Sequence, residues 1–88
     1  MIKAAFSIDG KKDFTPSKFF ITNDGTVYVF NYEIGFIRND TMTEEKLKDH
    51  IYNMVMEGFT IENIPLDKME MDLYRKAIVD YDIKFPKQ

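Results

Sequence analysis

The sequence of 88 residues contains no cysteine, no tryptophan and a single histidine. The absence of cysteine excludes a disulfide framework, a thiolate metal cluster and a cysteine nucleophile. Any core must therefore be held together by packing alone. With 44% hydrophobic, 31% charged and 15% aromatic residues, the composition excludes a disordered or low-complexity chain and predicts one small domain over residues 1–88.

Long hydrophobic runs and an excess of basic charge are also missing. The run between Lys3 and Asp9 near the N-terminus is too short for the hydrophobic part of a signal peptide or for a membrane span, so we expect a cytoplasmic protein without membrane contact. The formal net charge is −3, so the chain lacks the excess of basic residues that a domain binding duplex nucleic acid carries. The charge is uneven, because residues 1–20 carry +2 whereas residues 41–64 carry −3.

The usual signatures of catalysis and cofactor binding are absent. The sequence has no GxGxxG run and no phosphate-binding GKS or GKT loop. His50 has no nucleophile beside it, and we interpret it as a boundary residue of a helix rather than a general base. Glu45 and Asp49 lie four positions apart, but such a pair on a wet helix surface normally repels rather than holding a cation. We therefore expect no enzyme activity, no metal site and no cofactor.

The first half of the chain has the pattern of β-strands. Apolar residues alternate with polar ones near the N-terminus, and Asn23-Asp24-Gly25 separates two runs rich in β-branched and aromatic residues, which predicts a hairpin. Both faces of the run at 26–32 are largely apolar, so this strand is either covered on both sides or uses one face for binding. The predicted strands cover residues 2–8, 18–22, 26–32 and 33–38.

The second half has the period of helices. Thr41 with Glu44 matches a capping box, Thr43 is an equally good N-cap, and Gly58 suits the helix end. Residues 59–64 alternate again and are either a short edge strand or an extended connector. Pro65 then suits the first turn of a second helix.

These elements predict an α+β fold, in which strands are grouped before helices. The β-meander of three to four antiparallel strands occupies about residues 1–38, and two helices packed on one face of the sheet occupy about residues 41–81. We expect the second helix from about Leu66 to Tyr81 and a tail at residues 82–88.

The second helix carries more apolar residues than one sheet contact needs, over an arc of roughly 200°. One stripe consists of Leu66, Met69, Leu73 and Ala77. The other stripe, which we assign to a partner or a second copy of the chain, consists of Met71, Tyr74, Ile78 and Tyr81. Methionine and tyrosine suit adaptable interfaces. Packing within the core explains the same residues equally well, because a small domain can enclose its last helix on two sides.

The sequence therefore favours a non-catalytic, acidic protein-interaction module, with Glu44, Glu45 and Asp49 steering a basic partner surface or mimicking phosphates. Ten lysines against two arginines, with abundant Ile, Phe, Tyr and Asn, suit an AT-rich genome such as that of a low-GC bacterium or its phage. A phage-encoded inhibitor of a host protein or defence system is one form of this hypothesis.

A competing hypothesis comes from a second cluster of aromatic residues. Tyr28, Phe30 and Tyr32 share one face of their predicted strand and could stack the bases of a single-stranded nucleic acid. The acidic composition disfavours this alternative, because phosphate neutralisation supplies much of the affinity for nucleic acid. Core packing explains these rings as well.

Overall fold

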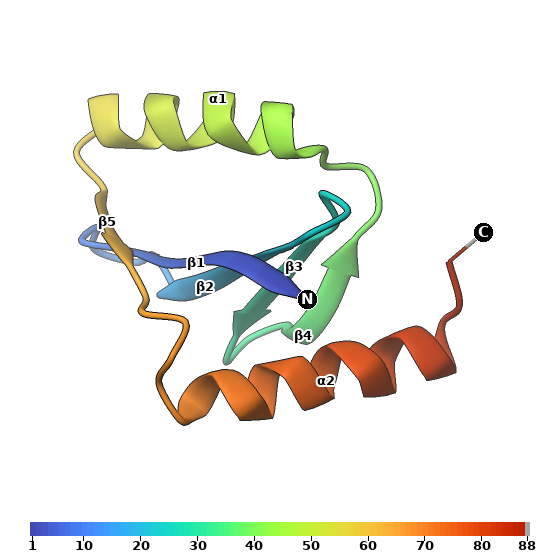
Figure 1. Ribbon diagram of the computed structural model, residues 1–88. Helices are drawn as coiled ribbons and strands as arrows, with labels where there is room; N and C mark the ends of the chain where they lie inside the picture. The colour runs from blue at the N-terminus through green and yellow to red at the C-terminus, as the bar shows by residue number, and fades with distance from the viewer. Residues whose placement is uncertain (88) are drawn as a thin grey trace.

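Four strands form an antiparallel meander in the first 39 residues, as the alternating pattern predicts. The computed structural model, which describes residues 1–87, places all strands in one antiparallel sheet of order β4-β3-β2-β1-β5 (Figure 1). Gly25 adopts a φ of +83° in the turn between β2 and β3, so the predicted hairpin is confirmed. The meander strands are β1 (Ile2–Asp9), β2 (Ser17–Thr22), β3 (Val27–Asn31) and β4 (Gly35–Asn39).

The sheet contains a fifth strand, β5 (Thr60–Asn63), which lies between the two helices in the chain. It pairs antiparallel with β1, with Ile61 opposite Ile8. Of the two alternatives for residues 59–64, the edge strand is therefore correct, and the sheet has five strands instead of three to four.

Both helices form, and their ends follow the capping signals to different degrees. Helix α1 (Glu44–Met56) begins after Thr43, whose hydroxyl accepts a hydrogen bond from the Lys46 N–H at 3.2 Å. Gly58 follows its end with a φ of +94°. Helix α2 (Glu70–Lys84) starts four residues later and ends three residues later than expected, and no side chain caps its first turn.

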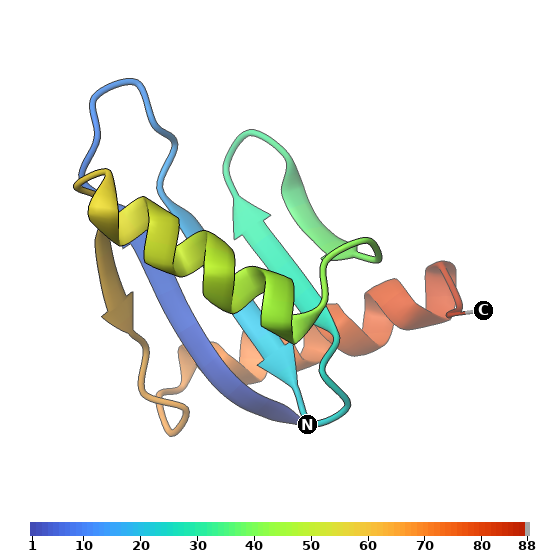
Figure 2. The same cartoon turned by 90° about the horizontal axis from the view of Figure 1, so that it is seen from above.

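The helices lie on opposite faces of the sheet (Figure 1), so the α+β class is confirmed but the packing of both helices on one face is wrong. Seen from above, α1 crosses in front of the strands and α2 lies behind them (Figure 2). Each face has its own core. The α1 core contains Phe6, Ile8, Phe19, Ile21, Val27, Val29, Leu47 and Met54. The α2 core contains Ile2, Ala5, Phe20, Tyr28, Met71 and Ile78.

The physical reason for this arrangement is that strands β1 to β3 carry apolar side chains on both faces. Phe19 enters the α1 core while its neighbour Phe20 enters the α2 core. A sheet that is apolar on both sides needs a helix on each. Neither helix in the part of the chain that the structure describes is long and apolar enough to cross a membrane.

Candidate protein-binding surface

The outward side of α1 carries an exposed stripe that the core does not use. Glu45, Asp49, Tyr52 and Met56 recur at spacings of four, three and four residues, which places them on one helix face. That face is opposite the buried residues of the same helix, Leu47 and Met54. Tyr52 is 66% exposed and Met56 is 71% exposed. We call Glu45, Asp49, Tyr52 and Met56 the α1 stripe.

The α1 stripe is acidic toward the start of the helix and apolar toward its end. The Glu45 carboxylate has only a long contact of 3.8 Å, to Lys48 Nζ, on a fully wet part of the helix. Asp49 forms no ion pair with any of residues 1–87. Val55 lies beside the stripe and is half exposed. The surface therefore offers unneutralised negative charge next to apolar side chains.

Glu44, the third predicted acidic residue, lies apart from this stripe. Its Oε1 accepts a hydrogen bond from Lys3 Nζ at 2.7 Å, which ties the first turn of α1 to strand β1. This hydrogen bond lowers the pKa of Glu44 below its ordinary value. Glu44 thus contributes to the fold, whereas Glu45 and Asp49 project into solvent.

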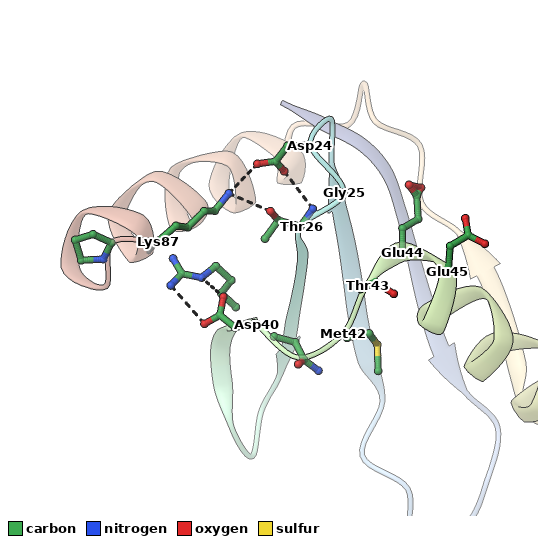
Figure 3. Close-up of a pocket in the computed structure, with 12 residues that line it drawn as sticks. Asp24, Gly25, Thr26, Asp40, Met42, Thr43, Glu44, Glu45 and Lys87 are labelled. Carbon is green, nitrogen blue, oxygen red and sulfur yellow. Dashed lines mark hydrogen bonds and ion pairs between the residues drawn. The ribbon is translucent and has the colours of Figure 1, made fainter.

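A polar cleft of about 790 Å³ lies beside the start of α1, between the β2–β3 turn and the C-terminal segment (Figure 3). Lys87 donates to the Asp24 carboxylate at 2.9 Å and to the Thr26 hydroxyl at 3.0 Å. Just after the end of β4, Asp40 accepts a hydrogen bond from Arg38 Nε at 2.6 Å.

The carboxylates of the cleft are largely neutralised from within the chain. Hydrogen bonds from Thr22, Lys87 and Thr26 hold the pKa of Asp24 well below its ordinary value. Asp40 has its own partner in Arg38. Apart from Glu45, which lines the cleft at the start of α1, the carboxylates of the cleft are paired within the chain. The least neutralised negative charge therefore lies on the α1 stripe.

The predicted partner residues of the second helix are mainly core residues. Met71 and Ile78 are buried against the sheet, so the assignment of these two side chains to a partner surface must be corrected. Tyr74 is half-buried, and its hydroxyl accepts from Lys18 Nζ at 3.1 Å. That hydrogen bond raises the pKa of Lys18, and the opposite effect of burial on the charged ammonium group is smaller. Tyr81 is half-buried beside the Phe85 ring, with centroids 4.8 Å apart.

The other apolar stripe of α2 is the one left in solvent. Leu73 is 70% exposed and Met69 is almost fully exposed, while Leu66 alone among the larger members packs against the α2 core. Polar partners decide which side of the helix faces the sheet. Arg38 and Tyr28 on the sheet both bond Asp82, which fixes the rotation of α2 about its axis.

The aromatic face proposed for single-stranded nucleic acid lies under α2. Tyr28 is buried, and its hydroxyl donates to both oxygens of Asp82, at 2.8 and 3.0 Å. Burial and this carboxylate raise the pKa of Tyr28 strongly. Phe30 is half-buried near the Tyr74 ring, and only Tyr32, in the β3–β4 turn, is exposed, at 91%. The three rings do not form an open stacking platform.

His50 lies in solvent at the rim of an apolar groove of about 300 Å³ between α1 and the β3–β4 hairpin. The residues that line the groove include Phe19, Val29 and Met54, with the amide of Asn31 as one of few polar groups. The lining residues include no carboxylate, and Ser17 is their one serine. The Ser17 hydroxyl is already engaged, because it accepts a hydrogen bond from the Asn31 amide and donates one to the Thr15 carbonyl. Among residues 1–87, no group of three or more potential ligands is placed to hold a metal ion.

Comparison with family models, curated proteins and solved structures finds no match for this chain. The surface must therefore be interpreted from its own geometry. Sequence reasoning identified Glu45 and Asp49 but missed Tyr52 and Met56. A signal for both was present, because they lie on the side of the helix opposite the apolar residues Leu47 and Met54.

Proposed function

We propose that this protein is a non-catalytic interaction module that binds another protein through the α1 stripe. The observation that carries the proposal is the exposure of Tyr52 and Met56 beside Glu45 and Asp49, on a helix whose opposite side is already committed to the core. Tyrosine and methionine supply adaptable apolar contact area at interfaces, and a helix face of this kind fits a groove on a partner.

The chemistry of the stripe defines the partner. Glu45 and Asp49 favour lysine or arginine side chains near the start of α1, and Tyr52 and Met56 favour an apolar depression about two helical turns further on. Nucleic acid does not fit this surface, because phosphates and carboxylates repel.

A basic partner surface of this type commonly serves to bind phosphates. A module that covers it with carboxylates would block that use, so inhibition is the natural consequence of binding. This role agrees with the hypothesis of a phage-encoded inhibitor of a host protein or defence system.

The test compares capture of host proteins by the tagged wild-type protein and by variants of the α1 stripe. We expect Tyr52→Ala, Met56→Ala and Glu45→Lys each to weaken capture of the same partner by roughly tenfold, as truncation of an interface anchor does. The acidic contribution should make capture weaker at high salt.

The matched control is Met69→Ala, which removes an even more exposed methionine from the other side of the molecule. We expect it to capture the partner as the wild type does. Thermal melts followed by circular dichroism verify that every variant is folded. Partner capture that is unchanged in all α1 variants, or lost equally in Met69→Ala, would show that the α1 stripe is not the binding surface.

A further inference from the structure

The outward side of α2 has an arrangement of its own. Met69, Leu73, Lys76, Asp80 and Ile83 recur at spacings of four, three, four and three residues, the spacing of a coiled-coil seam. The side chain of Ile78, which is buried against the sheet, defines the inward direction of α2. Counted around the helix axis, Lys76 and Asp80 lie within about 20° of the opposite, outward direction, and Leu73 and Ile83 lie within about 40° of it. Leu73 is 70% exposed and Ile83 is 73% exposed. We call Leu73, Lys76, Asp80 and Ile83 the α2 seam.

The two charged residues of the α2 seam have no ion-pair partner among residues 1–87. Lys76 and Asp80 are four positions apart on the same helix but do not meet within 4 Å. Lysine before aspartate is the less favourable order for such a pair within a helix. Both charges are thus available to another molecule.

The α2 seam is complementary to itself. Lys76 lies two residues before Ile78 and Asp80 lies two residues after it, while Leu73 and Ile83 lie five residues before and after it. Two antiparallel copies of α2, centred at the level of Ile78, therefore bring opposite charges together in the middle and apolar side chains together at both ends. A two-fold axis makes each contact occur twice.

We propose that the α2 seam binds a second copy of this chain, as an antiparallel helix pair across a two-fold axis. Lys76 of each copy pairs with Asp80 of the other, and Leu73 of each copy packs beside Ile83 of the other. A parallel pair is disfavoured, because it places lysine against lysine and aspartate against aspartate. The α2 layer lies on the outer side of the fold, away from α1, and its outward face is open to such contact (Figure 1).

The α1 stripe cannot form the same kind of pair. Its charged members, Glu45 and Asp49, are both acidic, and no basic residue occupies the last turn of α1. An antiparallel α1 pair would place carboxylates against Tyr52 and Met56, and a parallel pair would place them against each other. Self-association thus belongs to α2, and the α1 stripe remains for a different protein.

A single short helix on each side makes a small interface. We expect a dissociation constant between roughly 10 µM and 1 mM, in the range of transient contacts. Sedimentation equilibrium or light scattering over this concentration range should show a monomer–dimer equilibrium for the wild-type protein.

Exchange of the central charges tests the pairing. Lys76→Asp and Asp80→Lys each replace attraction by repulsion at two symmetric contacts, and each should weaken the dimer at least about tenfold. The double variant carrying both changes restores opposite charges at every contact and should dimerise like the wild type. An equimolar mixture of the two single variants should form a heterodimer for the same reason.

Cysteine cross-linking provides an independent measurement of orientation, because the chain has no cysteine of its own. An oxidised mixture of Leu73→Cys and Ile83→Cys should form a mixed disulfide dimer in preference to the two homodimers. A wild-type protein that stays monomeric at about 1 mM refutes the proposal. So do single charge variants that dimerise as the wild type does, or cross-links that favour the homodimers.

Discussion

Removal of the Asp82 carboxylate should destabilise the attachment of α2 to the sheet. Asp82 accepts hydrogen bonds from Arg38 Nη1 at 2.8 Å and from the Tyr28 hydroxyl at 2.8 Å. The Arg38 side chain is only 6% exposed, and it also donates to the Phe85 carbonyl at 2.7 Å. Asp82→Ala leaves the Tyr28 hydroxyl without its acceptor and removes one of the acceptors of Arg38.

The expected cost follows from these contacts. Both hydrogen bonds are made to the charged carboxylate of Asp82, and a bond of this kind contributes about 1.5–3 kcal/mol where it is well buried. Arg38 keeps its contacts to Asp40 and Phe85, so the loss stays below the roughly 3–5 kcal/mol of a fully broken buried pair. Asp82 itself is partly exposed, and we expect a loss of about 2 kcal/mol in the free energy of unfolding.

Urea denaturation followed by circular dichroism measures this loss. A domain of this size should show its midpoint lowered by roughly 1–2 M for Asp82→Ala. Tyr28→Phe removes one donor to this partly exposed carboxylate without creating a cavity and should cost about 1–2 kcal/mol. The matched control is Asp72→Ala on the same helix, because Asp72 pairs with Arg75 at 2.9 Å on the exposed surface and should contribute less than about 1 kcal/mol.

A loss of stability in Asp82→Ala no larger than that in Asp72→Ala would contradict this expectation. Such a result would mean that the hydrogen bonds around Arg38 form once α2 has packed on the sheet but add nothing to the stability of that packing. A double-mutant cycle with Tyr28→Phe and Asp82→Ala adds a second check, since two residues in direct contact should show non-additive effects.

Two further predictions concern the α1 core and the response to acid. Leu47→Ala should lower the free energy of unfolding by about 3 kcal/mol, since Leu47 is fully buried, whereas Val55→Ala on the wet side of the same helix should cost less than about 1 kcal/mol by urea denaturation. The lowered pKa of Asp24 adds stability that is present above its ordinary value of 3.8 and is lost as the carboxyl protonates in acid. The melting temperature of the wild type should therefore fall more between about pH 5 and pH 2 than that of Asp24→Asn, and equal slopes would contradict this assignment.

The elements that sequence reasoning located well are those with strong local signals. The turn at Asn23-Asp24-Gly25 and the start of α1, predicted at Thr41 or Thr43 and observed at Thr43, depend on a few neighbouring residues, and a sequence window contains all of them. The start of α2 was placed too early because Pro65 signals where a helix is allowed to begin, and residues 66–69 form turns instead.

The side of the sheet on which each helix lies is not a local property. Apolar residues on both faces of β3 indicated that both needed cover, but the route of the chain decided which helix covers which face. Edge strand β5 carries the chain along β1 between the helices, and α2 then continues on the far side.

The hydrophobic pattern could not predict the rotation of α2 about its axis, since both stripes of this helix are apolar. Leu73 and Ile78 are equally hydrophobic and either would suit a core, but Leu73 is exposed in the structure and Ile78 is buried. Lys18 and Arg38 on the sheet select the side that carries Tyr74 and Asp82, through hydrogen bonds between residues more than 40 positions apart. Pairings at such separations leave no periodic signal.

The placement of α1 and α2 on opposite faces of one sheet has a consequence for valency. The two helices do not compete for space, so occupation of the α2 seam leaves the α1 stripe free. A pair of chains joined through α2 would carry its two α1 stripes on the outer sides, directed away from each other. Such an assembly would bridge two partner molecules, or two sites on a repetitive partner, and would gain avidity from modest individual contacts.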